Sequence, residues 1–253
     1  LDPDAVYNNP AGVVFMDNGF HIGINDQMAK QTRTVTSTYA PFAMSNGNAT
    51  KEYVGEVFSP IIPSVHFAWK HNRWAVMVGM GVNGGGGSLE FDNGLASFER
   101  EFSVLPAGMQ QLEIPATGYD MDMYLLGKSM TLAFNVGAAF RITDWLSVAA
   151  QVRLGVTNNS YTGAIEGIKI NPTMAAMGLN GQMMGAAQFF TAAGQMLGAI
   201  NPALAAQAAK YAALTSDHIL DVKQKGTSIS PILAVALHKG KWDASIKYEF
   251  KMG

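Results

Sequence analysis

The chain has 253 residues, a formal net charge of −2 and no cysteine. Its 17 basic and 19 acidic residues are nearly balanced, so the charge does not indicate a nucleic-acid partner. The absence of cysteine excludes disulfides and thiol chemistry. Charged residues make up only 14% of the chain, well below the roughly 25% of an average soluble domain.

The N-terminal stretch contains the turn sequence Asn9-Pro10-Ala11-Gly12. Proline fixes its own φ angle and moves the preceding residue out of the helical region, while Gly12 permits a positive φ. Taken alone, this pattern is typical of an ordinary loop that leads into a strand.

Apolar residues alternate with polar or small residues along seven segments, the pattern of β-strands. The alternation is clearest in 129–141, where Met130, Phe134 and Phe140 share one face. Residues 30–50 and 92–128 are expected to form long loops because they are rich in turn-forming and polar residues. The seven expected strands are 19–25, 53–69, 74–83, 129–141, 146–157, 221–238 and 242–251.

Between the fifth and sixth strands the composition changes to alanine, methionine and glutamine, which favours helix. Asn171-Pro172 and Asn201-Pro202 resemble helix starts with proline in the first turn. Two helices are therefore predicted, at about 173–198 and 202–215, within an insertion spanning 172–216. This region is interrupted by polar residues and does not read as a membrane-spanning helix.

Strand pairs 2–3, 4–5 and 6–7 are joined by tight turns, whereas the other connections are long. Aromatic residues gather beside the tight turns. Short turns on one side, long loops on the other and an aromatic girdle are typical of a transmembrane antiparallel β-barrel. The alternative is a soluble two-layer β sandwich with its apolar face inside. The girdle residues are Trp69, Trp74, Phe140, Trp145 and Trp242.

Asn9-Pro10-Ala11, placed just before the first strand, resembles the hatch of the FadL/TodX (OMPP1) family of outer-membrane transport proteins. The resemblance covers nearly the whole chain. Features in the same order are Pro63-Ser64-Val65-His66-Phe67, the glycine-interrupted third strand, the fourth strand into Arg141, the helical insertion and the Lys239-Gly240-Lys241 hairpin.

The resemblance implies an all-β, fourteen-stranded barrel in the bacterial outer membrane, plugged by a hatch. This chain supplies about seven strands, so it is expected to be half of a barrel that a C-terminal half or a second chain completes. Residues 1–18 would be the hatch remnant and 19–253 the barrel strands. The implied function is uptake of fatty acids or other hydrophobic small molecules, with outer-membrane lipid as the other partner.

The family mechanism assigns ligand capture to apolar residues of the outer loops. The candidates here are Met183, Met184, Phe189, Phe190, Met196 and Leu197. The alternative is that these residues only pack the two helices together. The hatch tip at Asn9, Pro10 and Ala11 is expected to shift when ligand binds, the alternative being a static plug.

A kinked third strand in the family opens sideways toward the bilayer. Gly84, Gly85, Gly86 and Gly87 are placed for such an opening, although a plain bend is the alternative. A ligand carboxylate would meet an inward cation, for which Arg153 and Arg141 are the candidates. The alternative is that these cations pair with lumen carboxylates.

No nucleophile elbow, zinc-ligand spacing or phosphate loop is present, so neither enzymatic activity nor a cofactor or metal is expected. Ser64 and His66 both point inward, but their spacing on one strand has no evident third partner. Asp120 and Asp122 are too few for a cation site. Two further hypotheses remain: a structural or surface-interaction barrel, and a lipid-modifying barrel enzyme.

Overall fold

The computed structural model describes residues 2–111 and 114–251, and most of them belong to antiparallel β-strands. The predicted antiparallel β architecture is confirmed in this respect. The strands are β1 (Gly19–Asn25), β2 (Ala29–Thr38), β3 (Thr50–Ser59), β4 (Ser64–His71), β5 (Trp74–Phe91), β6 (Ala116–Arg141), β7 (Leu146–Met174), β8 (Leu179–Asn180), β9 (Met184–Gly185), β10 (His218–Lys239) and β11 (Trp242–Glu249).

The main path of the sheet runs β1-β4-β5-β6-β7-β10-β11, and β2 pairs with β3, which in turn pairs with the far end of β5. The ladder between β7 and β10 is continuous from Ile165↔His218 to Leu146↔Leu237. Within the described residues, β1 and β11 each have a neighbour on one side only along this path. Both therefore present an unpaired backbone edge.

The N-terminal segment covers one face of the sheet, which we call the inner face. It consists of α1 (Ala5–Asn8) and the 3₁₀ helix η1 (Pro10–Phe15). Its apolar side chains pack on small residues of the strands, including Ala75, Ala139 and Ala236. Small strand residues leave room for the segment, so it lies directly on the sheet and buries its own valines, Val6, Val13 and Val14.

The opposite, outer face carries large apolar side chains that remain exposed. Val136 on β6 is 59% exposed and Leu233 on β10 is 52% exposed. A soluble sandwich would bury these residues and expose the small and polar ones, which is the reverse of what is seen. The aromatic residues beside the tight turns lie at one margin of this apolar band, where Trp74 packs on Phe140 with ring centroids 4.6 Å apart.

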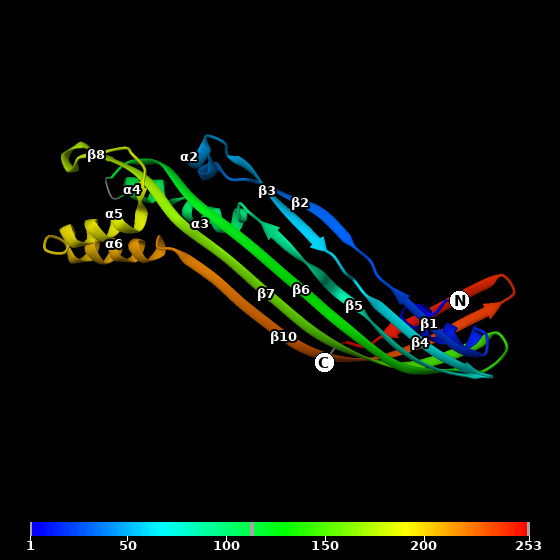
Figure 1. The fold of residues 1–253 in the computed structure, drawn as a ribbon. Coiled ribbons are helices and arrows are strands. Elements are labelled where there is room, and N and C mark those ends of the chain that lie inside the picture. Colours follow the sequence, from blue (N-terminus) through cyan, green and yellow to red (C-terminus); the bar gives the residue numbers. More distant parts are fainter. Residues whose placement is uncertain (1, 112–113, 252–253) are drawn as a thin grey trace.

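The remaining helices lie at the other end of the long strands (Figure 1), away from the N-terminal segment. They pack on the far ends of β6 and β7 through a second apolar cluster that includes Phe102, Tyr119, Ile170 and Phe190. These elements are η2 (Ala40–Phe42), α2 (Ala43–Asn46), α3 (Ala96–Phe102), α4 (Leu105–Gln111), η3 (Ala175–Met177), α5 (Ala186–Leu197) and α6 (Pro202–Leu214). No helix of the described chain has both the length and the apolar content needed to cross a membrane.

Several element boundaries differ from the sequence predictions. Residues 30–50 hold strand β2 rather than a loop, and 92–128 hold α3, α4 and the start of β6. The expected strand 53–69 is divided into β3 and β4 because two prolines, Pro60 and Pro63, flank a break that cannot continue the ladder. The described residues form eleven strands where about seven were expected, because of β2, this division and the short β8 and β9.

The helical insertion also begins differently. Strand β7 continues to Met174, so the helix expected at 173–198 starts only at Ala186 in α5. The second helix matches its prediction closely, since α6 begins at Pro202 and Asn201 caps it by accepting hydrogen bonds from the amides of Ala203 and Leu204.

Candidate functional site

An apolar groove of about 610 Å³ lies among the helices at the far end of the strands. Phe189 and Phe190 of α5 form its base, and both are buried. Their rings meet edge to face at 5.3 Å, and Phe190 stacks on Tyr211 of α6 at 5.2 Å. The aromatic base is thus rigid. The lining residues are Met109, Ile114, Met174, Met177, Phe189, Phe190, Ala193, Met196, Leu197, Ile200, Leu204 and Ala208.

Exposed apolar residues, one of them a methionine, also line the groove. Met196 is 60% exposed and Ile200 is 81% exposed, and both border the opening. Methionine adapts to irregular apolar shapes because its side chain is unbranched and polarisable. A rigid aromatic base with an adaptable rim suits a site for elongated apolar molecules.

Four of the six predicted capture residues line this groove: Phe189, Phe190, Met196 and Leu197. Met183 and Met184 do not. Met184 belongs to β9, which pairs with Ile170 of β7, and Met183 approaches Gly118. Met109 of α4 and Met174 and Met177 also line the groove and were not among the predicted residues, because the sequence predicts a loop where α4 lies and a helix from 173.

At the same end of the sheet, a buried carboxylate ties three elements together. Glu99 of α3 accepts a hydrogen bond of 2.6 Å from the Tyr119 hydroxyl of β6. It also accepts hydrogen bonds from Tyr53 and Lys51, both on β3, and forms an ion pair with Lys51. Burial by itself raises the pKa of Glu99, but the hydrogen bonds from Lys51, Tyr119 and Tyr53 outweigh it and leave the pKa below its ordinary value.

Glu99 also contributes to the pKa shifts of its two tyrosine partners. Burial first, and then the hydrogen bond to Glu99, raises the pKa of both Tyr53 and Tyr119. Both phenols therefore remain donors at any physiological pH. The cluster holds β3, α3 and β6 in one arrangement and supports the end of the sheet on which the groove lies.

The Asn9-Pro10-Ala11 stretch is the junction between α1 and η1. The Asn9 side chain accepts a hydrogen bond from the Gly12 amide at 3.1 Å and so caps η1, which begins at Pro10. Pro10 and Ala11 are buried against the sheet rather than at an exposed tip. The Ala11 carbonyl accepts a hydrogen bond of 2.6 Å from the Ser147 hydroxyl of β7.

Tyr7 of α1 lies close to two cations. The guanidinium carbon of Arg153 lies 4.5 Å from the centre of its ring, and the Lys247 ammonium lies 5.2 Å from it. Lys247 also donates a hydrogen bond of 3.1 Å to the Tyr7 carbonyl, and the Tyr7 hydroxyl donates one to Asn83. The N-terminal segment is therefore anchored by polar as well as apolar contacts.

Arg153 is almost fully buried on the inner face, with 4% exposure. It forms an ion pair with Glu249 of β11 at 2.7 Å, and its Nε donates to Asn135 at 2.8 Å. Arg153 Nη2 and Asn135 Nδ2 are buried without a hydrogen-bond partner among the described residues. With Lys247 nearby, the cluster holds two positive groups and one carboxylate, so it can accept a further anionic oxygen.

Arg141, the second predicted cation, lies at another level of the sheet. It pairs in the β6–β7 ladder with Ser147, whereas Arg153 pairs with Asn135. The structure therefore does not bring the two arginines together. Arg141 is close to the tight turn, where its backbone amide donates to the Arg73 carbonyl at 2.9 Å.

The glycine run from Gly84 to Gly87 lies where the sheet is interrupted. Strand β4 pairs with β5 only up to Ser64↔Gly81, and β3 resumes the pairing at Phe58↔Ser88. On that side, residues 82–87 of β5 have no ladder partner in the described chain. On the other side, the ladder with β6 shifts register twice within the same stretch, as expected of β-bulges.

Glycine is required at part of this stretch. Gly85 has a φ of 71°, and a Cβ there would lie 2.1 Å from the Ser129 carbonyl oxygen. Gly84, by contrast, has open space around a Cβ, with no atom within 4 Å. The run therefore contains a position where the backbones of β5 and β6 approach closely, Gly85, and one with open space around its Cβ, Gly84.

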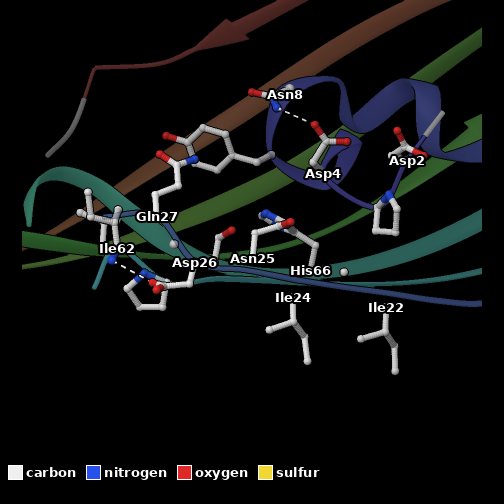
Figure 2. A pocket seen from close by; sticks show the side chains of 17 residues that line it. Asp2, Asp4, Asn8, Ile22, Ile24, Asn25, Asp26, Gln27, Ile62 and His66 are labelled. Carbon is white, nitrogen blue, oxygen red and sulfur yellow. Dashed lines mark hydrogen bonds between the residues drawn. The ribbon is translucent and has the colours of Figure 1, made fainter. Parts of the chain in front are cut away.

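A polar pocket of about 930 Å³ lies between α1 and the strands β1 and β4 (Figure 2). Acidic and amide side chains line it, among them Asp4, Asn8 and Asp26. The Asn8 amide donates to the Asp4 carboxylate at 3.3 Å, and the Asp26 carboxylate accepts a hydrogen bond from the Ile62 amide at 3.0 Å. The side chains of Asp4, Asn8 and Asp26 are thus already paired.

Ser64 and His66 both line this pocket. No hydrogen bond joins them in the described residues, and His66 Nδ1 is buried without a partner. Asp120 and Asp122 lie elsewhere, on β6, where Asp120 forms an exposed ion pair with Lys169 at 3.4 Å. Within residues 2–111 and 114–251, no group of three histidine, aspartate or glutamate side chains is arranged to hold a metal ion.

Neither a scan against protein-family models nor a search of curated proteins finds a match to this chain.

Proposed function

We propose that this chain forms part of an outer-membrane channel that takes up fatty acids or other hydrophobic small molecules. The apolar groove among the helices carries the proposal, because it offers an aromatic base and an adaptable rim to an elongated apolar ligand. The groove lies at the end of the strands opposite the N-terminal segment, where a ligand would be captured first.

A location in a bilayer is supported by the two faces of the sheet. Exposed large apolar residues cover the outer face, whereas small and polar residues cover the inner face. On β6 the outward apolar run extends from Met130 to Phe140, close to the about 9–11 residues with which a tilted strand crosses a bilayer. A bacterial outer membrane is the proposed location, with the groove outside the cell.

Further strands must then pair with β1 and β11. An open sheet edge in a bilayer would leave its backbone groups without hydrogen-bond partners, at a cost of several kcal/mol for each group. We propose that other strands, on a second chain or elsewhere in the same protein, close the sheet into a barrel. The N-terminal segment would then plug the barrel near the tight turns.

The proposed route runs from the groove along the inner face to the interruption beside Gly84–Gly87. A carboxylate ligand would pair with Arg153, whose Nη2 has no partner in the described chain, and with Lys247 beside it. Leaving sideways through the interrupted ladder would keep the apolar tail out of water. The plug would shift as the ligand reaches the Tyr7–Arg153 contact.

The groove is tested by making it polar. In Met196→Gln/Leu204→Gln, both changed residues line the groove and are partly exposed, so folding is retained. We expect affinity for a fluorescent long-chain fatty acid to fall roughly tenfold, because each residue loses part of its apolar contact with the ligand. Fluorescence titration of the protein in vesicles measures this.

The matched control is Leu214→Gln/Ile219→Gln, which removes two exposed apolar residues that do not line the groove. The control should bind as the unchanged protein does. If both double variants bind the fatty acid with unchanged affinity, the groove is not the capture site. If the unchanged protein binds no apolar probe at all, the transport proposal fails.

A further inference from the structure

A group of lysines lies on the outer face just beyond the apolar band, on the side of the helices. Lys128 of β6 lies one step of the alternation beyond Met130 and interrupts the outward apolar run of this strand. Lys223 and Lys225 lie on the neighbouring part of β10. All three side chains are exposed. We call these three residues the lysine group.

The register of the sheet brings the group together. Lys128 and Lys223 both pair with Ser160, one from each side of β7. Lys128, Ser160 and Lys223 therefore form one row across the sheet. Residues directly opposite in a ladder point to the same face, and neighbouring strands are about 4.8 Å apart. The α-carbons of Lys128 and Lys223 are therefore roughly 10 Å apart, with the small Ser160 between them.

Lys225 lies in the next row, opposite Asn158, which also pairs with Met130. It stands roughly 7 Å along β10 from Lys223, at the level where the apolar band ends. The long, flexible lysine stems let all three ammonium groups converge above Ser160 and Asn158. The lysine group thus lies beside the apolar band and around the small polar side chains of Ser160 and Asn158.

The charges of the group are largely free of partners. Lys128 and Lys225 form no ion pair within the described residues, and Lys223 has only a loose contact of 3.9 Å with Asp221, both side chains being exposed. The acidic neighbours lie farther from the band. Asp221 pairs with Thr162, in the next row outward, and Glu90 of that row accepts a hydrogen bond from Tyr124.

We propose that the lysine group binds the phosphate groups of an anionic glycolipid of the lipid A type. This inference rests on the proposed location in the outer membrane. Lysines at the edge of a membrane-facing apolar surface attract anionic lipid headgroups, while the acyl chains cover the apolar residues. The three lysines lie in two adjacent rows beside the apolar band. They would therefore meet lipid phosphate groups at a single depth in the bilayer.

The test uses the protein in phosphatidylcholine vesicles that contain lipid A with two phosphates. We expect Lys128→Gln/Lys223→Gln to weaken lipid A binding by roughly 25-fold, since each lysine near an anionic surface contributes about fivefold. Lipid A retained after detergent extraction is quantified by mass spectrometry. Dephosphorylated lipid A should be retained equally weakly by the variant and the unchanged protein.

The control is Lys239→Gln/Lys241→Gln, which removes the same charge at the tight-turn end and should leave retention unchanged. Lys128→Arg/Lys223→Arg should keep it. Equal retention by the lysine-group variant and the unchanged protein would overturn the inference, as would equal retention of the phosphorylated and dephosphorylated lipid. Failure of the unchanged protein to insert into vesicles would instead overturn the proposed membrane function.

Discussion

The docking of the N-terminal segment on the inner face gives a prediction that can be worked out from two hydrogen bonds. The Ser147 hydroxyl donates to the Ala11 carbonyl at 2.6 Å, and the Gln151 amide donates to the Val6 carbonyl at 3.0 Å. Both donors are buried. In Ser147→Ala/Gln151→Leu, the two carbonyls lose these donors and remain buried.

The cost of an unpaired buried polar group is about 1–3 kcal/mol, so the double variant disfavours docking by roughly 2–6 kcal/mol. Because every 1.4 kcal/mol changes an equilibrium about tenfold, the undocked population should rise by at least about 25-fold. The apolar contacts of the segment remain, so the plug should still be docked most of the time.

The assay uses a single cysteine in a chain that otherwise has none. Val14→Cys places a thiol at a position with no exposed surface. The rate at which a membrane-impermeant thiol reagent labels it reports the undocked population, provided that redocking is faster than labelling. We expect the double variant to raise this rate by at least about 25-fold.

Ser230→Ala, in the same Val14→Cys background, is the matched control. Ser230 is buried on the same face, but its hydroxyl has no hydrogen-bond partner in the described chain, so its removal should leave the labelling rate unchanged. A labelling rate for the double variant within twofold of the unchanged background would refute the reasoning that these bonds hold the segment.

Two further predictions concern the interrupted ladder and the buried carboxylate. A Cβ at Gly84 meets no atom within 4 Å, so Gly84→Val adds bulk beside the interrupted ladder and should lower fatty-acid uptake by cells while leaving groove affinity unchanged; equal uptake would argue against lateral exit. Gly85→Ala should instead disturb the ladder because of its 2.1 Å approach to Ser129. The depressed pKa of Glu99 means that its stabilisation is present above the ordinary carboxyl pKa and is lost as pH falls through the lower folded value. Hydrogen exchange of α3, corrected for intrinsic rates, should therefore accelerate on acidification. Glu99→Gln should remove that dependence and destabilise the region by about 3 kcal/mol, because the mostly buried Lys51 loses its ion-pair partner. If hydrogen exchange of α3 in Glu99→Gln still accelerates on acidification, a group other than Glu99 causes the pH dependence.

The sequence by itself determined the strands whose two faces differ in polarity. In 129–141 and 146–157 the alternation is strict, because one face meets small inner residues and the other is apolar, and the structure has β6 and β7 there. Asn201 and Pro202 likewise marked the start of α6, since a cap and a first-turn proline act locally. The sequence also showed directly which aromatic residues lie beside the tight turns.

Only the tertiary structure decided the features that depend on pairing between distant segments. The outer ends of β6 and β7 carry no clean alternation and become strands because they pair with each other. Strand β2 was not predicted from the sequence because its threonine-rich residues also suit a loop. The contacts of Tyr7 with Arg153 and of Lys51 with Glu99 join residues far apart in the chain. No local pattern encodes such contacts, because they arise from the register of the sheet and the docking of the N-terminal segment on it.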